Sequence, residues 1–362
     1  MGQTLSEPVT QKETSRCENS WLRVGSSCMQ GWRVNMEDAH TTILSLPDDP
    51  GTAFFAVYDG HGVHDAAIKI ARCSGRLAQR APSSIFMDFY RFGDNRLGTT
   101  GLRYRYPSPI YKNKVHWIRR VLVQRVSDAV QKRSHSSIQC TLVSAKDSSS
   151  LYGVLINLRM HTWMIIFSRT KLYGNVGDSR AIASVGGRVE ELSNDHKPSL
   201  ASEQRRITAA GGWVELNRVN GNLALSRALG DFVFKKNEEK GPEDQIVTAN
   251  PDVEVRELTE EWEFIILACD GIWDVMTNQE VVDFVRLRLS QGMEPEDVCE
   301  DLMTRCLAPD CQMGGLGCDN MTVILICITH SGSWRELQEK CSRPSLALIN
   351  QNHEEDSDAD LQ

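Results

Sequence analysis

The chain has 362 residues and a formal net charge of −8, with 41% hydrophobic and 24% charged residues. That composition is typical of one large globular domain or two medium ones, and its negative balance gives no reason to expect a nucleic-acid partner. No stretch reaches the ~18 apolar residues of a membrane-spanning helix, so we expect a soluble protein.

Residues 1–20 are polar, lack the apolar core of a secretory signal, and are expected to be disordered. The first six residues, Met-Gly-Gln-Thr-Leu-Ser, fit the pattern for N-myristoylation of Gly2. The alternative is an unmodified tail that happens to begin with Met-Gly. Because one myristoyl chain gives only reversible membrane contact, we expect a protein of the cytoplasm or nucleus that associates with membranes when Gly2 is modified.

Eleven cysteines are scattered from Cys17 to Cys341. An odd, scattered set without a secretory signal is typical of reduced thiols in the cytosol or nucleus. The closest group is Cys306, Cys311 and Cys318, whose spacing is wider than that of the cysteine pairs in zinc sites. We therefore do not expect a zinc ion there.

A change of charge divides the chain after its first predicted strand. Residues 21–62 include AFFAVYDGHG, an apolar run typical of a buried strand that ends in a turn. Residues 63–171 then hold 19 Lys and Arg against 5 Asp and Glu, whereas the remainder holds 21 basic and 43 acidic residues. Three interpretations are open: a genuine basic insertion, an arm that binds nucleic acid or another anionic surface, or an incorrectly predicted coding segment. A solvated insertion is favoured over nucleic-acid binding.

Regular structure is expected to return at about Thr170. KLYGNVGDSRAIASV predicts two strands around a Gly-Asp turn, and EFIILACDGIWDVM predicts a buried strand followed by the start of a helix. Two amphipathic helices, EVVDFVRLRL and PEDVCEDLMTRCL, precede a last buried strand, NMTVILICIT. From about Ser331 the chain is expected to form a solvated acidic extension.

Acidic residues sit at the ends of the most apolar strands. Asp59 and Asp270 directly follow FFAVY and FIILAC, and Asp319 precedes MTVILIC. Several carboxylates that converge at a sheet edge repel one another unless a cation lies between them, and hard oxygen ligands select Mg²⁺ or Mn²⁺ over Zn²⁺. For any single one of these residues, an ordinary Asp-Gly or Asp-Asn turn explains the sequence equally well.

Two further segments indicate phosphate chemistry. Glu37 and Asp38 follow four and five residues after Arg33, and an arginine guanidinium matches phosphate oxygens in a bidentate manner. His61 comes directly after the turn that follows Asp59, where an imidazole can give a proton to a leaving group. A metal, a phosphate-binding arginine and a proton donor together indicate phosphoryl hydrolysis.

Seven segments in order resemble the signatures of the metal-dependent protein Ser/Thr phosphatases, the type 2C or PPM family: GWRVNMEDAH, FFAVYDGHG, GNVGDSRA, DHKPS, GGWVELNRVNGNLALSRALGDF, ACDGIWDVM and DNMTVIL. The resemblance covers about residues 20–62 and 170–330. It implies an α+β fold, a β-sandwich flanked by helices on both outer faces. It also implies hydrolysis of phosphoserine and phosphothreonine in phosphoprotein substrates by a metal-activated bridging water, and a monomeric enzyme is expected.

The resemblance also assigns site residues by position. Two Mg²⁺ or Mn²⁺ ions would be held by six residues: Glu37, Asp38, Asp59, the backbone carbonyl of Gly60, Asp270 and Asp319. Asp195 and Asp274 match carboxylates that bind a third ion in relatives. Arg33 would hold the substrate phosphate and His61 would be the general acid. The segment from about Arg206 to Phe234 matches the flap that influences substrate choice.

The resemblance does not extend to residues 63–171 in these motifs. Val63 replaces a glycine, and neither the two core helices nor the Ser-Gly-Cys-Thr-Ala-like strand of relatives is visible. Without those helices one face of the sandwich would lose apolar burial. Two alternatives to an active enzyme follow: an inactive relative that binds phosphoproteins, or a non-folding product of a mispredicted exon. The expected domains are a disordered segment (1–20), a catalytic domain (21–330) interrupted by 63–171, and an acidic disordered tail (331–362).

Overall fold

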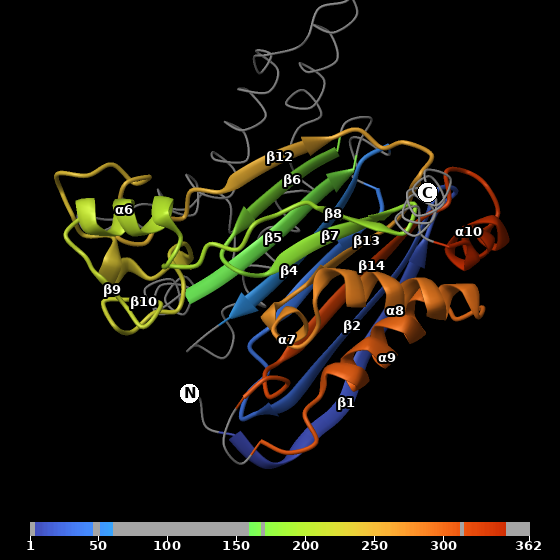
Figure 1. Cartoon of the computed structure of the whole chain (residues 1–362), viewed down its shortest axis with the longest axis horizontal. Coiled ribbons are helices and arrows are strands. Elements are labelled where there is room, and N and C mark those ends of the chain that lie inside the picture. Colours follow the sequence, from blue (N-terminus) through green and yellow to red (C-terminus); the bar gives the residue numbers. More distant parts are fainter. Residues whose placement is uncertain (1–3, 46–50, 61–158, 168–170, 312–314, 345–362) are drawn as a thin grey trace, which may run out of the picture.

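The computed structural model describes residues 4–45, 51–60, 159–167, 171–311 and 315–344 (Figure 1). Within these ranges the longer strands form two antiparallel sheets that pack face to face, and most of the helices cover the outer face of one of them. The predicted sandwich with flanking helices is therefore confirmed for the described part of the chain. The two core helices that relatives place within 63–171 would belong to the second helix layer, and residues 61–158 lie outside the described part.

The first sheet joins segments from both ends of the chain, in the order β1-β2-β14-β13-β7-β8. Its strands are β1 (Thr4–Glu18), β2 (Leu22–Arg33), β14 (Met321–Ile328), β13 (Trp262–Ala268), β7 (Arg180–Val185) and β8 (Arg188–Glu191). Because β2 pairs with β14 so that Met29 lies opposite Met321, the end of β2 lies beside the segment that precedes β14. This pairing brings Arg33 to Asp319.

The second sheet has the order β12-β6-β5-β4-β3, and β11 also pairs with β5. Its strands are β12 (Asp252–Arg256), β6 (Lys171–Val176), β5 (Arg159–Phe167), β4 (Ala53–Gly60), β3 (Ala39–Ile43) and β11 (Leu229–Gly230). The chain passes from β6 in this sheet to β7 in the first sheet through a short turn, so residues of that turn lie at an end shared by both sheets.

Strand β14 shows why the central strands of the first sheet correspond to continuous apolar runs in the sequence. Ile324 and Ile326 belong to the core between the two sheets, together with Phe55 of β4. The alternate residues Val323 and Leu325 belong to the core beneath the helices. Successive side chains of a strand point to opposite faces, so a strand buried on both faces needs apolar residues at every position.

Four helices, α7 (Asp270–Trp273), α8 (Asn278–Ser290), α9 (Pro295–Cys306) and α10 (Trp334–Ser342), cover the outer face of the first sheet (Figure 1). A capping box in which Thr277 and Glu280 exchange hydrogen bonds fixes the start of α8. The two predicted amphipathic helices are confirmed as α8 and α9. None of the helices in the described ranges has the length and hydropathy that crossing a bilayer requires.

A smaller unit stands at one end of the sandwich (Figure 1). It contains α6 (Ala201–Ala209), the short strands β9 (Val214–Glu215) and β10 (Arg218–Val219), and the 3-10 helix η2 (Phe232–Phe234). Ile207, Val219 and Leu225 form the centre of its own apolar core. The segment predicted as a flap is therefore an ordered unit with a separate core.

Two terminal predictions were wrong. The segment expected to be disordered near the N-terminus contains β1, which pairs with β2 and adds side-chain hydrogen bonds of 2.8 Å between the hydroxyls of Thr14 and Ser27 and between those of Ser15 and Ser26. An edge strand is held largely by its backbone, so its polar composition concealed it. Near the C-terminus, Leu337 and Cys341 of α10 are buried, although a solvated extension was expected from about Ser331. Residues 345–362 lie outside the described part.

Strand β5 corrects a third expectation. It lies within the segment set apart by its basic charge, yet it pairs with both β4 and β6 in the middle of the second sheet. Arg159 and His161 interrupt the apolar pattern of this strand in the sequence, which concealed it. Regular structure therefore returns before Thr170.

Candidate metal centre

Three carboxylates converge where the two sheets end. One carboxylate oxygen from each of Asp59, Asp178 and Asp270 lies within 4.8 Å of the other two. Asp59 is the penultimate residue of β4, and Asp178 lies in the turn between β6 and β7. Asp270 is the first residue of α7, two residues after the end of β13. The group thus draws on both sheets, and the rigid strands hold its members close together.

Glycines make two of these positions possible. Gly177 has a φ of +105°, in the left-handed region where a side chain is strained. It turns the chain directly before Asp178, which lies between β6 and β7. At Gly271 a Cβ would lie 2.1 Å from the carbonyl oxygen of Asn320. Only glycine permits that approach, which sets the beginning of α7 against the segment carrying Asp319.

Asp178 was not predicted as a ligand. The Gly-Asp pair was expected to form the turn between two strands, and that turn is confirmed. The available signal was the same as for Asp59 and Asp270, an aspartate at the end of an apolar strand. The structure adds this residue to the candidate set.

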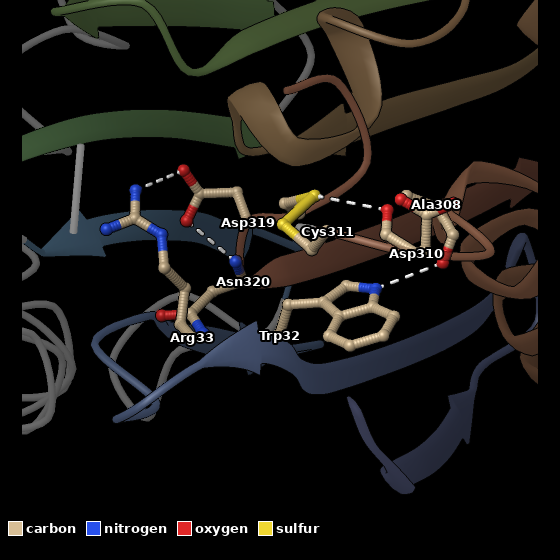
Figure 2. Close-up of a disulfide and its surroundings, with 8 residues drawn as sticks. Trp32, Arg33, Ala308, Asp310, Cys311, Asp319 and Asn320 are labelled. Atoms are coloured by element: carbon tan, nitrogen blue, oxygen red, sulfur yellow. Dashed lines mark hydrogen bonds and ion pairs between the residues drawn. A yellow bond between two sulfur atoms is a disulfide. The ribbon is translucent and has the colours of Figure 1, made fainter. Parts of the chain in front are cut away.

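Arg33, Asp319 and Asn320 form a hydrogen-bonded group (Figure 2). The negative charges of Asp270 and Asp59 also act on Arg33, so this group is near the carboxylates. Arg33 Nη2 donates to Asp319 Oδ2 at 2.5 Å, and Asp319 Oδ1 accepts from the Asn320 N–H at 2.7 Å. The Asn320 side chain accepts from the Glu37 N–H at 2.8 Å and donates to the Gln30 carbonyl at 2.7 Å. Asn320, which was not predicted, therefore joins the loop after β2 to the segment before β14.

The remaining predicted residues lie in different settings. Asp38 is 5% exposed and accepts from the Thr322 hydroxyl at 2.8 Å. Gly60 is buried and follows Asp59 at the end of β4. Asp274 lies one helical turn after Asp270, so both side chains share one side of α7. His61 and Gly2 lie outside the described residues.

Asp195, predicted as a ligand of a third ion, is engaged elsewhere. Its two carboxylate oxygens accept from Arg180 Nε at 3.0 Å and Arg180 Nη2 at 2.8 Å. A bidentate pair of this kind holds both carboxylate oxygens in a fixed orientation toward the guanidinium. Among the described residues, the group of three carboxylates includes Asp178 and leaves Asp195 out.

Burial and crowding raise the pKa values of the central carboxylates. Burial is the largest cause for Asp59 and Asp270, whose pKa values rise well above the ordinary range, and the negative charges of the neighbouring aspartates raise them further. Burial also raises the pKa of Asp38 to about 7. Buried, crowded carboxylates ionise readily only when positive charge lies among them. All-oxygen donors of this kind fit Mg²⁺ or Mn²⁺.

The shift at Asp38 predicts how stability depends on pH without a divalent ion. A carboxyl group whose folded pKa is raised from 3.8 to about 7 binds more protons in the folded state, so its stabilising contribution is present at low pH and is lost as pH rises through this interval. We expect the protein in EDTA to have a lower Tm at about pH 8 than at about pH 5.5. Thermal unfolding of Asp38→Asn is the control, because the difference between its Tm values at these two pH values should be smaller. An unchanged difference would contradict the assignment to Asp38.

A disulfide between Cys311 and Cys318 lies near Asp319 and Asn320 (Figure 2). The expectation of reduced thiols is therefore wrong for this pair, whose Cα atoms are 6.0 Å apart. The two cysteines pack with Trp32, whose indole N–H donates to the Ala308 carbonyl at 3.0 Å. A spacing of seven residues does not reveal this pairing, because the loop must fold before the sulfurs meet. Seven other cysteines in the described ranges have free thiols.

Comparisons with known proteins identify the family. A family model described as protein phosphatase 2C matches residues 22–85 and 123–313. A probable protein phosphatase 2C of Caenorhabditis elegans is 49% identical, over 96% of this chain and 85% of that protein. Protein phosphatase 2C homolog 2 of Hypocrea jecorina is 41% identical, over 95% of this chain and 70% of that protein.

The fold is shared with a solved structure of serine-threonine phosphatase 2C from Toxoplasma gondii. The TM-score is 0.61 at 20% sequence identity, and the match covers 91% of this chain and 100% of that chain. At this identity the likeness concerns the fold alone. It agrees with the two-sheet architecture described above.

The family match is wider than the seven motifs indicated. It includes residues 63–85 and 123–171 and leaves only 86–122 unmatched between its two parts. The statement that the whole of 63–171 lacks the resemblance was therefore wrong, and a shorter segment is set apart. With more than half of its residues matched by the family model and its carboxylates gathered at the sheet ends, the chain belongs to the protein phosphatase 2C family, the metal-dependent protein serine/threonine phosphatases.

Proposed function

We propose that this chain hydrolyses phosphoserine and phosphothreonine esters in protein substrates, and that Asp59, Asp178 and Asp270 hold the divalent cations that it needs. The observation that carries this proposal is the convergence of three buried or half-buried carboxylates within 4.8 Å. Such a group is unfavourable without a cation. Family membership supplies the reaction class and the substrate class.

The ions are proposed to be Mg²⁺ or Mn²⁺, two in number, with a third at lower affinity. Further ligands are proposed from the sequence resemblance: Glu37, Asp38, Asp319, the Gly60 carbonyl and, for the third ion, Asp195 and Asp274. When bound, such ions supply an acidified water as nucleophile and positive charge against the phosphoryl oxygens.

Arg33 is proposed to bind the substrate phosphate. Its side chain is 36% exposed, and one of its terminal nitrogens pairs with Asp319. A guanidinium has five N–H donors in a rigid fork, so donors remain for phosphate oxygens while the bond to Asp319 fixes the orientation. His61 follows Gly60 directly in the chain. That position supports its proposed role of protonating the departing serine or threonine oxygen.

Three further proposals rest on the sequence alone. Gly2 is proposed as an N-myristoylation site that gives reversible membrane contact. The protein is proposed to reside in the cytoplasm or nucleus and to act as a monomer.

Hydrolysis of a phosphothreonine peptide by the full chain tests the proposed function. We expect phosphate release with Mn²⁺ or Mg²⁺ and none above background in EDTA. Binding of the peptide without any phosphate release at saturating Mn²⁺ would instead support the alternative of an inactive phosphoprotein-binding relative. A chain that does not fold, by circular dichroism, would support the alternative of a mispredicted exon.

A matched pair of variants tests the choice between Asp178 and Asp195. Asp178→Asn should weaken Mn²⁺ binding ~10-fold or more, as loss of a metal-site carboxylate does. Asp195→Asn should leave the affinity for the two tighter Mn²⁺ ions nearly unchanged and lower stability by ~1 kcal/mol, because it breaks a partly exposed ion pair with Arg180. Isothermal titration with Mn²⁺ and urea unfolding measure the two effects. The reverse pattern would favour Asp195 over Asp178 as a ligand.

A further inference from the structure

A lysine contacts the carboxylate group from the side of Asp178. Lys197 Nζ donates to Asp178 Oδ2 and lies 4.0 Å from Asp195 Oδ2. The lysine side chain is 32% exposed, whereas the Asp178 side chain is 4% exposed. One carboxylate that belongs to the candidate metal centre is therefore already in contact with a positive charge of the chain itself.

The backbone holds Lys197 in this place. The His196 N–H donates to the Gly177 carbonyl, and the Gly177 N–H donates to His196 Nδ1, both at 3.0 Å. His196 directly precedes Lys197, and Gly177 directly precedes Asp178. The two hydrogen bonds between His196 and Gly177 therefore set the side chains of Lys197 and Asp178 beside each other. Because His196 Nδ1 accepts, its Nε2 carries the proton and faces Asp252 Oδ2 at 3.0 Å.

Residues of the small unit at the end of the sandwich also hold His196 and Lys197 in place. Ser226 donates to the His196 carbonyl from its N–H at 3.1 Å and from its hydroxyl at 2.8 Å. Arg227 links Asp252, at 2.7 Å, to the buried Glu203 of α6, also at 2.7 Å. Lys197 is thus positioned by contacts on several sides rather than by its own flexible chain.

We propose that Lys197 is a built-in cation that competes with a divalent ion for Asp178 and so weakens metal binding on this side of the centre. A lysine ammonium and a divalent ion both gain from the Asp178 carboxylate, and they repel each other at short range. Ions held mainly by Asp59 and Asp270 are affected less, since the lysine contacts Asp178. The chain therefore keeps one cation position weak. This inference rests on the proposed function, because it concerns ligands of the same centre.

The test measures Mn²⁺ binding directly, by the electron paramagnetic resonance signal of free Mn²⁺ during titration of the full chain. Lys197→Met should bind its weakest Mn²⁺ about tenfold more tightly than the unchanged protein, a difference of about 1.4 kcal/mol. Lys197→Arg keeps the charge and should stay within about twofold. Lys340→Met is the matched control, because it removes a lysine of α10 whose Nζ donates to the Glu260 carbonyl.

The sign of the effect separates competition from bracing. If Lys197 only braced the Asp178 turn, its removal would weaken Mn²⁺ binding or leave it unchanged, and either result would overturn the inference. In an Asp178→Asn background, Lys197→Met should change the affinity less than about twofold, since the competing contact is gone. Lys197→Gln gives the same measurement if the methionine variant does not fold.

The failure of this inference is distinguishable from failure of the proposed function. If the wild-type protein binds Mn²⁺ and releases phosphate, but Lys197→Met binds Mn²⁺ no more tightly than the wild type, only the role of Lys197 is overturned. An unchanged protein that binds no Mn²⁺ overturns both.

Discussion

Asp270→Asn is expected to lower Mn²⁺-dependent hydrolysis of a phosphothreonine peptide by about 10³-fold, equivalent to about 4 kcal/mol of transition-state stabilisation. Asparagine keeps the shape of the side chain but removes the negative charge that a divalent ion needs. Neighbouring negative charges crowd Asp270, because Asp178, Asp319 and Asp274 all raise its pKa after burial itself. Phosphate release at saturating Mn²⁺ measures the effect.

The same variant should be at least as stable as the unchanged protein when no metal is present. Removing one charge from a crowded, buried group relieves repulsion, whereas the rise in Tm that Mn²⁺ gives the unchanged protein should largely disappear. Asp283→Asn is the matched control, because Asp283 is an exposed residue of α8 that accepts only from Gln279 among the described side chains. Retention of Mn²⁺-dependent activity in Asp270→Asn would remove the proposed centre.

The sequence predicts the carboxylates that lie at strand ends, and physical chemistry explains why. Asp59 and Asp270 follow apolar runs that bury on both faces, so their position at the sheet end is determined once the strand is recognised. The sequence does not distinguish Asp178 from Asp195 as a ligand, because Asp178 follows β6, Asp195 follows β8, and both therefore lie just beyond a strand end. The distinction depends on where Arg180 points, and the structure places that side chain against Asp195.

Other features had no periodic signal to reveal them. Strand β1 is polar because it lies at a sheet edge, where backbone pairing needs no apolar face. Asn320 acts through two hydrogen bonds to the loop after β2 and one to Gln30 within β2, on residues almost three hundred positions away in the sequence. Contacts of that range follow from the pairing of β2 with β14, which composition alone does not specify.

Gly271→Ala is expected to be the most damaging single methyl group near the centre. The added Cβ would lie 2.1 Å from the Asn320 carbonyl oxygen and 3.3 Å from Met321 Cγ. The backbone of Asn320 has little freedom to move away, because its side chain is bonded to the Gln30 and Asn35 carbonyls at 2.7 and 3.0 Å. Either α7 or the segment before β14 must shift. We expect a loss of ~3 kcal/mol in the free energy of unfolding, at the upper end of overpacking effects.

That shift should also separate Asp270 from Asp319, so Mn²⁺ affinity should fall by ~10-fold, as it does when the support of a metal ligand is disturbed. Urea unfolding and Mn²⁺ titration measure the two losses in one protein. Gly241→Ala is the matched control: its added Cβ would meet only Asp244 Oδ2, at 3.9 Å. Because the substitution at Gly271 adds no charge and touches no carboxylate, a joint loss of stability and Mn²⁺ binding would show that the close approach of α7 to Asn320 builds the centre. Normal Mn²⁺ binding by a destabilised Gly271→Ala protein would show that the carboxylates assemble without it.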